Sequence, residues 1–193
     1  MIVILDNGHG VNTPGKCSPD KTLLEYKWAR EMVDLLITEF EKHGIQTVKL
    51  VPEDTDISLS QRVKRANQIY KDNNKQAILI SVHCNAAGAD GKWHNANGWS
   101  VFIAQNASSN SKRLAKCLYE QAEKNNLKGN RSVPKEKYWV QSLAICRDTS
   151  CPAVLTENMF QDNQEDVKLL LSEEGKRKII DVHVQGVLEY LNK

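Results

Sequence analysis

The stretch Ala77-Ile78-Leu79-Ile80-Ser81-Val82-His83 decides the fold class, because it is apolar at nearly every position until Ser81 and His83. A strand exposed on one face alternates apolar and polar residues, whereas a continuous apolar run is typical of a strand covered on both faces. Similar short apolar runs lie at 2–6 and 153–157. The pattern predicts a parallel sheet in an α/β protein.

Helical patterns separate these strands. The first helix carries apolar residues at four-residue steps, namely Leu24, Trp28, Met32, Leu36 and Phe40. The other expected elements are strands at 45–51, 99–104 and 143–147, and helices at 58–73, 108–126, 163–171 and 173–191. We therefore predict one α/β domain over residues 1–193, with a mostly parallel, twisted sheet that carries helices on both faces.

The composition excludes several classes of protein. The 193 residues carry 26 Lys and Arg against 24 Asp and Glu, so no basic excess is present to neutralise the phosphates of a nucleic acid. Hydrophobic residues make up 40% and charged residues 26%, as in ordinary globular proteins. No apolar run approaches the ~18–20 residues that a membrane span needs. We expect a monomeric globular protein without a nucleic-acid partner or a membrane span.

The first residues and the cysteines bear on the compartment. Residues 1–6 lack the basic start and the longer apolar stretch of a secretory signal, so we expect an unexported chain or a trimmed mature form. The 5 cysteines are odd in number and form no C-x-x-C pair, which favours free thiols over a disulfide framework or a zinc ribbon.

Metal-ligating residue types stand at the expected strand ends, where α/β proteins place their sites. His9 follows the first strand between two glycines, which would let the backbone approach closely, and His83 ends the third strand. Glu157 ends the run 153–157, and Glu25 lies in the first turn of the first helix. Two histidines and a carboxylate are a frequent ligand set for catalytic zinc. From these residues alone, a metal site and separate structural roles remain equally good interpretations.

A family resemblance distinguishes between the two interpretations. Five blocks of the chain resemble, in order, motifs of the zinc-dependent N-acetylmuramoyl-L-alanine amidases of the amidase_3 type, which cleave bacterial peptidoglycan. The blocks are Ile4-Leu5-Asp6-Asn7-Gly8-His9-Gly10; Leu24-Glu25; Asp56, Leu59, Arg62, Ala66 and Asn67; Ile80-Ser81-Val82-His83-Cys84-Asn85-Ala86; and Pro152-Ala153-Val154-Leu155-Thr156-Glu157 with Phe160 and Asn163.

The resemblance implies roles for four residues. His9, Glu25 and His83 would bind one zinc ion per chain, and Glu157 would be the catalytic carboxylate. The reaction implied is hydrolysis of the amide bond between the lactyl group of N-acetylmuramic acid and L-alanine of the stem peptide. Peptidoglycan would then be the partner, and the chain would act on the cell wall, in the periplasm or outside the cell. A phage-type lysin released at lysis fits the missing signal as well as a trimmed form does.

Four positions depart from the family pattern. Asn7 stands where the family often has Pro, and Cys84 where it usually has Ala. The pair Asn158-Met159 replaces a smaller pair, and we expect it to alter the wall of the substrate site next to Glu157. No inserted helix is evident between His83 and Glu157, so we expect an open site.

Contacts with the substrate are predicted for Asn85, Arg147 and Trp93. Asn85 lies two residues after a proposed ligand, Arg147 follows the expected strand 143–147, and Trp93 falls in a loop where it would stack on a sugar ring. Trp28 lies on the apolar face of the first helix, and Trp99 opens a strand, so both are expected in the core.

Two other functions remain open at this stage. One is a non-catalytic peptidoglycan-binding module, against which the presence of all four chemical residues argues. The other is a cysteine hydrolase that uses Cys84 with His83. Adjacent strand residues point to opposite faces of a sheet, so these two side chains are poorly placed to pair.

Overall fold

The computed structural model describes residues 1–192. Strands and helices alternate along the chain, as expected for an α/β protein. The elements are β1 (Ile2–Asn7), α1 (Glu25–Lys42), β2 (Gln46–Lys49), α2 (Leu59–Asp72), β3 (Ala77–Asn85), β4 (Ser100–Ile103), α3 (Ser109–Lys124), β5 (Trp139–Val140), α4 (Ala144–Arg147), β6 (Ala153–Phe160), α5 (Gln164–Leu171) and α6 (Glu173–Asn192).

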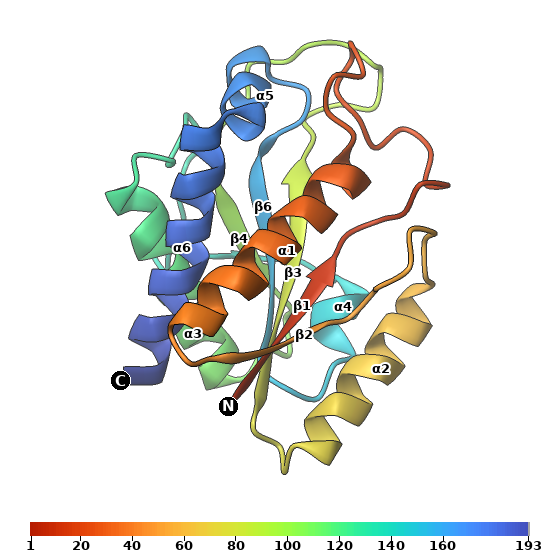
Figure 1. Cartoon of the computed structure of the whole chain (residues 1–193). Helices are drawn as coiled ribbons and strands as arrows, with labels where there is room; N and C mark the ends of the chain where they lie inside the picture. The colour runs from red at the N-terminus through yellow and green to blue at the C-terminus, as the bar shows by residue number, and fades with distance from the viewer. Residues whose placement is uncertain (193) are drawn as a thin grey trace.

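One six-stranded sheet has the order β2-β1-β3-β6-β4-β5. The strands β2, β1, β3 and β6 are parallel to one another, β4 runs antiparallel to β6, and β5 pairs parallel with β4. The carboxyl ends of β1, β3 and β6 therefore meet at one edge, from which long loops rise at the top of Figure 1. The predicted mostly parallel sheet is confirmed.

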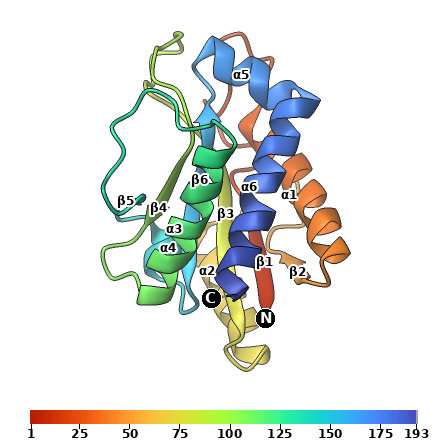
Figure 2. The same cartoon turned by 90° about the vertical axis from the view of Figure 1, so that its left-hand side faces the viewer.

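Helices cover both faces of the sheet, as predicted. Alternate residues of β1 enter different cores: Val3 and Leu5 pack with α1, α3 and α6, and Ile4 packs with α2 and α4. On the first face α6 lies between α1 and α3, which Figure 2 shows clearly. Within residues 1–192, no helix is long and apolar enough to cross a membrane.

The segment 143–147 is a helix, so the predicted strand there is wrong. After Leu143 the chain forms the single turn α4, which buries Ile145 and Cys146 in the α2 side of the core. A short apolar run fits a strand and a buried helical turn equally well. The strand that pairs with β4 at the edge of the sheet is β5, which has two residues and is not indicated by the sequence pattern.

Local features agree with the expected elements. Ser58, the first residue of the helix expected at 58–73, caps α2, and its Oγ accepts the backbone N–H of Gln61. Trp28 and Trp99 are buried in the core, with 3% and 1% of their surfaces exposed. β6, however, is three residues longer than expected, because the buried polar side chain of Asn158 finds hydrogen-bond partners inside the protein.

Candidate metal centre

His9, Glu25 and His83 come together at the carboxyl edge of the sheet. His9 follows β1, Glu25 is the first residue of α1, and His83 lies near the end of β3. One nitrogen of each ring and a carboxylate oxygen all lie within 4.8 Å of one another. Three segments that are far apart in the sequence thus contribute one ligand-type atom each to the same point.

Glu25 is the buried member of this group, with its side chain 1% exposed. Its Oε1 accepts the Cys84 backbone N–H at 3.0 Å and lies 3.1 Å from His83 Nδ1 and 3.4 Å from His9 Nε2. Its Oε2 is buried and has no hydrogen-bond partner. A buried carboxylate oxygen without a partner is costly, so this atom is free to bind a cation.

The backbone around His9 is held in an uncommon conformation. His9 has φ +59°, a left-handed conformation that side chains other than Gly seldom adopt. Its carbonyl oxygen accepts hydrogen bonds from the guanidinium groups of Arg30, at 3.1 Å, and Arg62, at 3.2 Å. The two arginines stabilise the turn that points the imidazole at Glu25.

Gly8 gives the close approach that the sequence predicts. A Cβ placed on Gly8 would lie 2.3 Å from Cε1 of His83, closer than any side chain tolerates. A larger residue at this position would therefore push the His83 ring away from Glu25 and His9.

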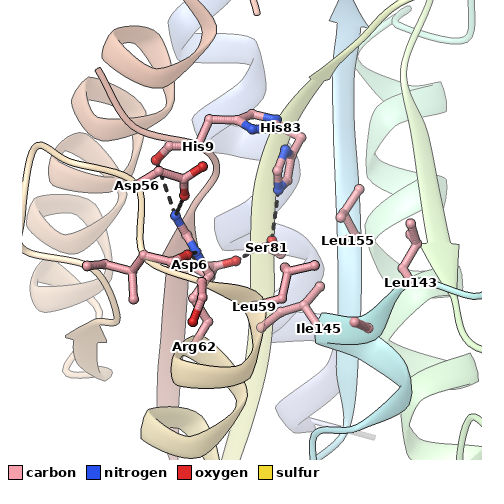
Figure 3. Close-up of a pocket in the computed structure, with 13 residues that line it drawn as sticks. Asp6, His9, Asp56, Leu59, Arg62, Ser81, His83, Leu143, Ile145 and Leu155 are labelled. Carbon is pink, nitrogen blue, oxygen red and sulfur yellow. Dashed lines mark hydrogen bonds and ion pairs between the residues drawn. The ribbon is translucent and has the colours of Figure 1, made fainter. Parts of the chain in front are cut away.

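A chain of hydrogen bonds fixes the ring of His83 (Figure 3). The Ser81 hydroxyl donates to Asp6 Oδ2 at 2.5 Å, and Asp6 Oδ1 in turn accepts from the Arg62 guanidinium. Because its own hydrogen is used, Ser81 Oγ accepts the Nε2–H of His83 at 3.1 Å. Nδ1 faces Glu25 Oε1 at 3.1 Å, and the proton that it shares with the carboxylate in the metal-free protein is the one that a metal ion would replace.

The charges inside the group support each other. Burial would raise the pKa of Glu25, but hydrogen bonds and the charge of His83 and His9 hold it well below its usual range. Burial would lower the pKa of His83, and the Glu25 carboxylate raises it instead. The carboxylate is therefore ionised, which is the form that binds a metal ion.

Glu157 lies one strand away from His83. The two residues are register partners in the parallel pair β3–β6, so their side chains are neighbours on the same face. Glu157 Oε2 is buried without a hydrogen-bond partner. Burial raises the pKa of Glu157 to about 7, against the opposing charge of His83. A carboxyl group with this pKa exchanges protons readily near neutral pH.

A cavity of about 360 Å³ opens beside the two histidines. Figure 3 shows His9 and His83 above it and Leu59, Leu143, Ile145 and Leu155 along its wall. The side chains of His9 and His83 are 19% and 16% exposed, so the cluster is accessible from this cavity. Between β3 and β6 the described chain has only two helices, α3 on the other face and the short α4, which agrees with the expected open site.

The predicted substrate contacts do not line this cavity. Asn85 Oδ1 accepts the N–H of Ala86 in its own loop. Trp93 packs on the hydrophobic core of the α1 side. Arg147 forms a bidentate pair with its neighbour Asp148, through bonds of 2.7 Å. Their roles in substrate binding stay predictions.

The pair Asn158-Met159 faces the core, so the expected effect on the substrate wall is wrong. Asn158 is fully buried and Met159 is 5% exposed. The register of β3 and β6 shifts at this point, because β6 carries one extra residue and Met159 adopts φ +66°. The bulge turns both side chains inward.

The roles of Asp6 and Ser81 in holding His83 become visible only in the structure. Both interrupt apolar strands, and they are register partners in the pair β1–β3. In the sequence, both are polar residues within an apolar run, and each precedes a histidine by two or three positions, which was the available signal.

Cys84 is unsuited to nucleophilic catalysis. Its side chain is buried on the opposite side of β3 from His83, and burial raises the pKa of the thiol well above its usual value. A reactive cysteine needs a lowered pKa and access to substrate. The geometry therefore argues against the cysteine hydrolase.

A His–Glu–His group with a neighbouring acid, at the carboxyl edge of an α/β sheet, is typical of hydrolases that use a metal ion. The family model for N-acetylmuramoyl-L-alanine amidase, Amidase_3, matches residues 3–189. The chain belongs to this family of amidases, and the predicted family membership is confirmed.

Individual relatives agree with the family. An endolysin of Bacillus phage SPP1 is 29% identical over 196 residues, which cover 99% of this chain and 66% of the relative. The N-acetylmuramoyl-L-alanine amidase CwlM of Bacillus licheniformis is 24% identical and is covered to 68%. The crystal structure of an N-acetylmuramoyl-L-alanine amidase from Clostridium difficile 630 has a TM-score of 0.83 at 26% identity, covering 100% of this chain and 97% of that one. The chain thus spans about two thirds of the length of these two curated relatives.

Proposed function

We propose that this chain is a zinc-dependent hydrolase that cleaves the amide bond between the lactyl group of N-acetylmuramic acid and L-alanine in peptidoglycan. The observation that carries the proposal is the buried, partnerless Oε2 of Glu25 within a group of three ligand atoms. The family match supplies the class of substrate. The site of action would be the cell wall.

The donor set fits a zinc ion. His9, Glu25 and His83 offer two imidazole nitrogens and one carboxylate oxygen, and three protein ligands leave a position for water or substrate. Ser81 and Asp6 orient His83 behind this set, as outer groups do in zinc sites. Zinc held there would polarise the scissile carbonyl and lower the pKa of a water molecule towards ~7.

Glu157 would perform the proton transfers. In its ionised form it takes a proton from the attacking water, and it then delivers this proton to the nitrogen of the leaving L-alanine. Burial raises the pKa of Glu157, which suits a group that must both take up and release a proton. The apolar side chains Leu59, Leu143, Ile145 and Leu155 line the cavity beside His9 and His83 and would strengthen electrostatic interactions there.

Product analysis tests the proposal. The purified protein, incubated with bacterial cell walls, is expected to release new amino groups of L-alanine and new lactyl carboxylates, which mass spectrometry identifies. A chelator should abolish the release, and added zinc should restore it. Glu157→Gln is expected to lower turnover by about 10²–10⁴-fold while the bound zinc stays unchanged.

A matched variant controls for the loss of an acid. Glu165 has an exposed side chain that pairs with Lys168 on α5, so Glu165→Gln should keep full activity. Binding to cell walls without product release would support the non-catalytic module. Activity that survives the chelator but is lost on thiol alkylation would support the cysteine hydrolase.

A further inference from the structure

Arg131 is an arginine whose donors are mostly unused. Its guanidinium lies over two aromatic rings, 4.9 Å from the centroid of Trp139 and 5.6 Å from that of Phe160. These rings hold the planar group in one orientation and partly shield it from water. Its Nη1 donates to the buried Ser100 Oγ at 3.1 Å, and this is its one hydrogen bond within the described part of the chain.

The other two buried arginines near the site are fully engaged. Arg62 pairs with Asp6 and Asp56, and Arg30 donates to the backbone carbonyls of His9 and Glu53. Among residues 1–192, no carboxylate lies within 4.0 Å of Arg131. The Glu157 carboxylate acts on the Arg131 guanidinium only from beyond ion-pair distance, so most donors of this half-buried group stay available to an anion of the substrate.

The place of Arg131 in the sheet puts it beside Glu157. Ser100, which binds Arg131, is the register partner of Glu157 in the antiparallel pair β4–β6. The side chains of Ser100 and Glu157 lie on the same face of the sheet, the face of α2 and α4. The carboxyl edge therefore carries, in strand order, His9, His83, Glu157 and then the guanidinium of Arg131.

We propose that Arg131 binds the free α-carboxylate of the second residue of the stem peptide, and so selects peptidoglycan in which this carboxylate is not amidated. The proposal rests on the proposed function. Glu157 must reach the leaving nitrogen of L-alanine, so the released peptide lies on the side of Glu157 and Arg131. The carboxylate of the next residue is only a few bonds from that nitrogen, and it matches the fork of a guanidinium.

The experiment compares two synthetic muramyl tripeptides, with and without amidation of the second residue's α-carboxyl group. The wild-type zinc enzyme is expected to favour the free acid by about tenfold to a hundredfold in kcat/KM, mainly through KM, as charge-assisted hydrogen bonds do. Arg131→Gln should bring the ratio close to one by weakening only the acid substrate.

A binding measurement separates recognition from turnover. Glu157→Gln enzyme is expected to bind the free acid more tightly than the amide, and the double variant with Arg131→Gln should bind both equally, as measured by calorimetry. Arg113→Gln is the matched control, because Arg113 also stacks on an aromatic ring, that of Tyr190, and makes a hydrogen bond, but lies between α3 and α6. It should leave the ratio unchanged.

Three results would overturn the proposal. The first is equal hydrolysis of both tripeptides by the wild-type enzyme. The second is an equal loss of kcat on both tripeptides in Arg131→Gln. The third is an unchanged ratio of kcat/KM, free acid over amide, in Arg131→Gln. If Arg131→Gln does not fold, Arg131→Lys keeps the charge without the fork and should reduce the preference severalfold, and an unchanged preference contradicts the proposal. Hydrolysis of neither tripeptide by the wild-type enzyme would instead contradict the proposed function.

Discussion

Two histidine clusters lie on the two sides of β6, and they differ in how their polar atoms are satisfied. His183 of α6 is fully buried, its Nδ1–H donates to the Ile179 carbonyl, and its Nε2 accepts from the Thr156 hydroxyl. His83 is partly exposed to the cavity, and its cluster keeps two buried carboxylate oxygens without partners. Thr156 and Glu157 are consecutive, so the strand directs one to each cluster.

The difference separates a structural cluster from a reactive one. In the His183 cluster, Asn158 donates to Thr156 Oγ1 and to the His83 carbonyl, and its Oδ1 accepts from the Trp99 indole. Burial lowers the pKa of His183 to about 4, so its ring stays neutral. In the metal centre, the unpaired oxygens and the raised pKa of Glu157 are costs that only a ligand or a reaction offsets.

The largest expected effect tests this separation directly. His83→Ala should reduce bound zinc from about one ion per chain to less than a tenth, because two protein ligands hold zinc poorly. His183→Ala should keep its zinc but lose about 2–4 kcal/mol of unfolding free energy, since it leaves a cavity and removes one hydrogen-bond partner of the Thr156 hydroxyl. Metal analysis and urea unfolding measure the two effects. Equal zinc loss in both variants would abolish the distinction.

The second prediction concerns pH. In zinc-free protein the pKa of Glu157 is about 7 when folded and near 4.5 when unfolded. Below pH 4.5 both states are protonated, and the carboxylate destabilises the fold progressively as the pH rises from 4.5 to 7. The free energy of unfolding of Glu157→Gln should therefore exceed that of the wild type by up to about 3 kcal/mol at pH 8 and equal it at pH 4. A gain independent of pH in chemical unfolding would contradict the raised pKa.

A smaller effect is expected from the groups behind the ligands. Ser81→Ala removes the acceptor of His83 Nε2–H and should weaken zinc binding by about 10–100-fold. Thr156→Val removes a hydroxyl from the other cluster and should leave zinc affinity unchanged while lowering stability by about 1–2 kcal/mol. Competition with a chromogenic chelator gives both affinities. Unchanged zinc affinity in Ser81→Ala would count against the hydrogen-bond chain from Asp6.

The smallest expected effect is none at all. Cys84 is buried in the core on the α1 side of β3, and burial raises the pKa of its thiol well above the usual value. Iodoacetamide should label Cys17, which is partly exposed, and leave Cys84 unmodified in the folded protein, as peptide mass spectrometry shows. Labelling of Cys84 with loss of activity would reopen the cysteine hydrolase.

The fold could be predicted from the sequence because it depends on local patterns, whereas the ligand group could be predicted only with the family resemblance. Continuous apolar runs indicate buried strands, and the residues at the carboxyl ends of parallel strands must meet at one edge of the sheet. The segment 143–147 could not be assigned, because one helical turn and a short strand bury the same few apolar side chains. The sequence does not distinguish Arg147 from Arg131 as a ligand-binding residue. In the structure Arg147 pairs with Asp148, whereas the guanidinium of Arg131 lies over two aromatic rings.

Both ends of the described chain lie at the amino edge of the sheet, away from the metal centre. β1 starts and α6 finishes at the bottom of Figure 1, whereas the ligands follow the strand tips at the top. A module fused to either end would leave the reactive edge unobstructed. For protein engineering, a wall-anchoring or affinity module can therefore be fused to either end. Its linker has to span the distance from the amino edge of the sheet to the carboxyl edge, where the substrate would bind.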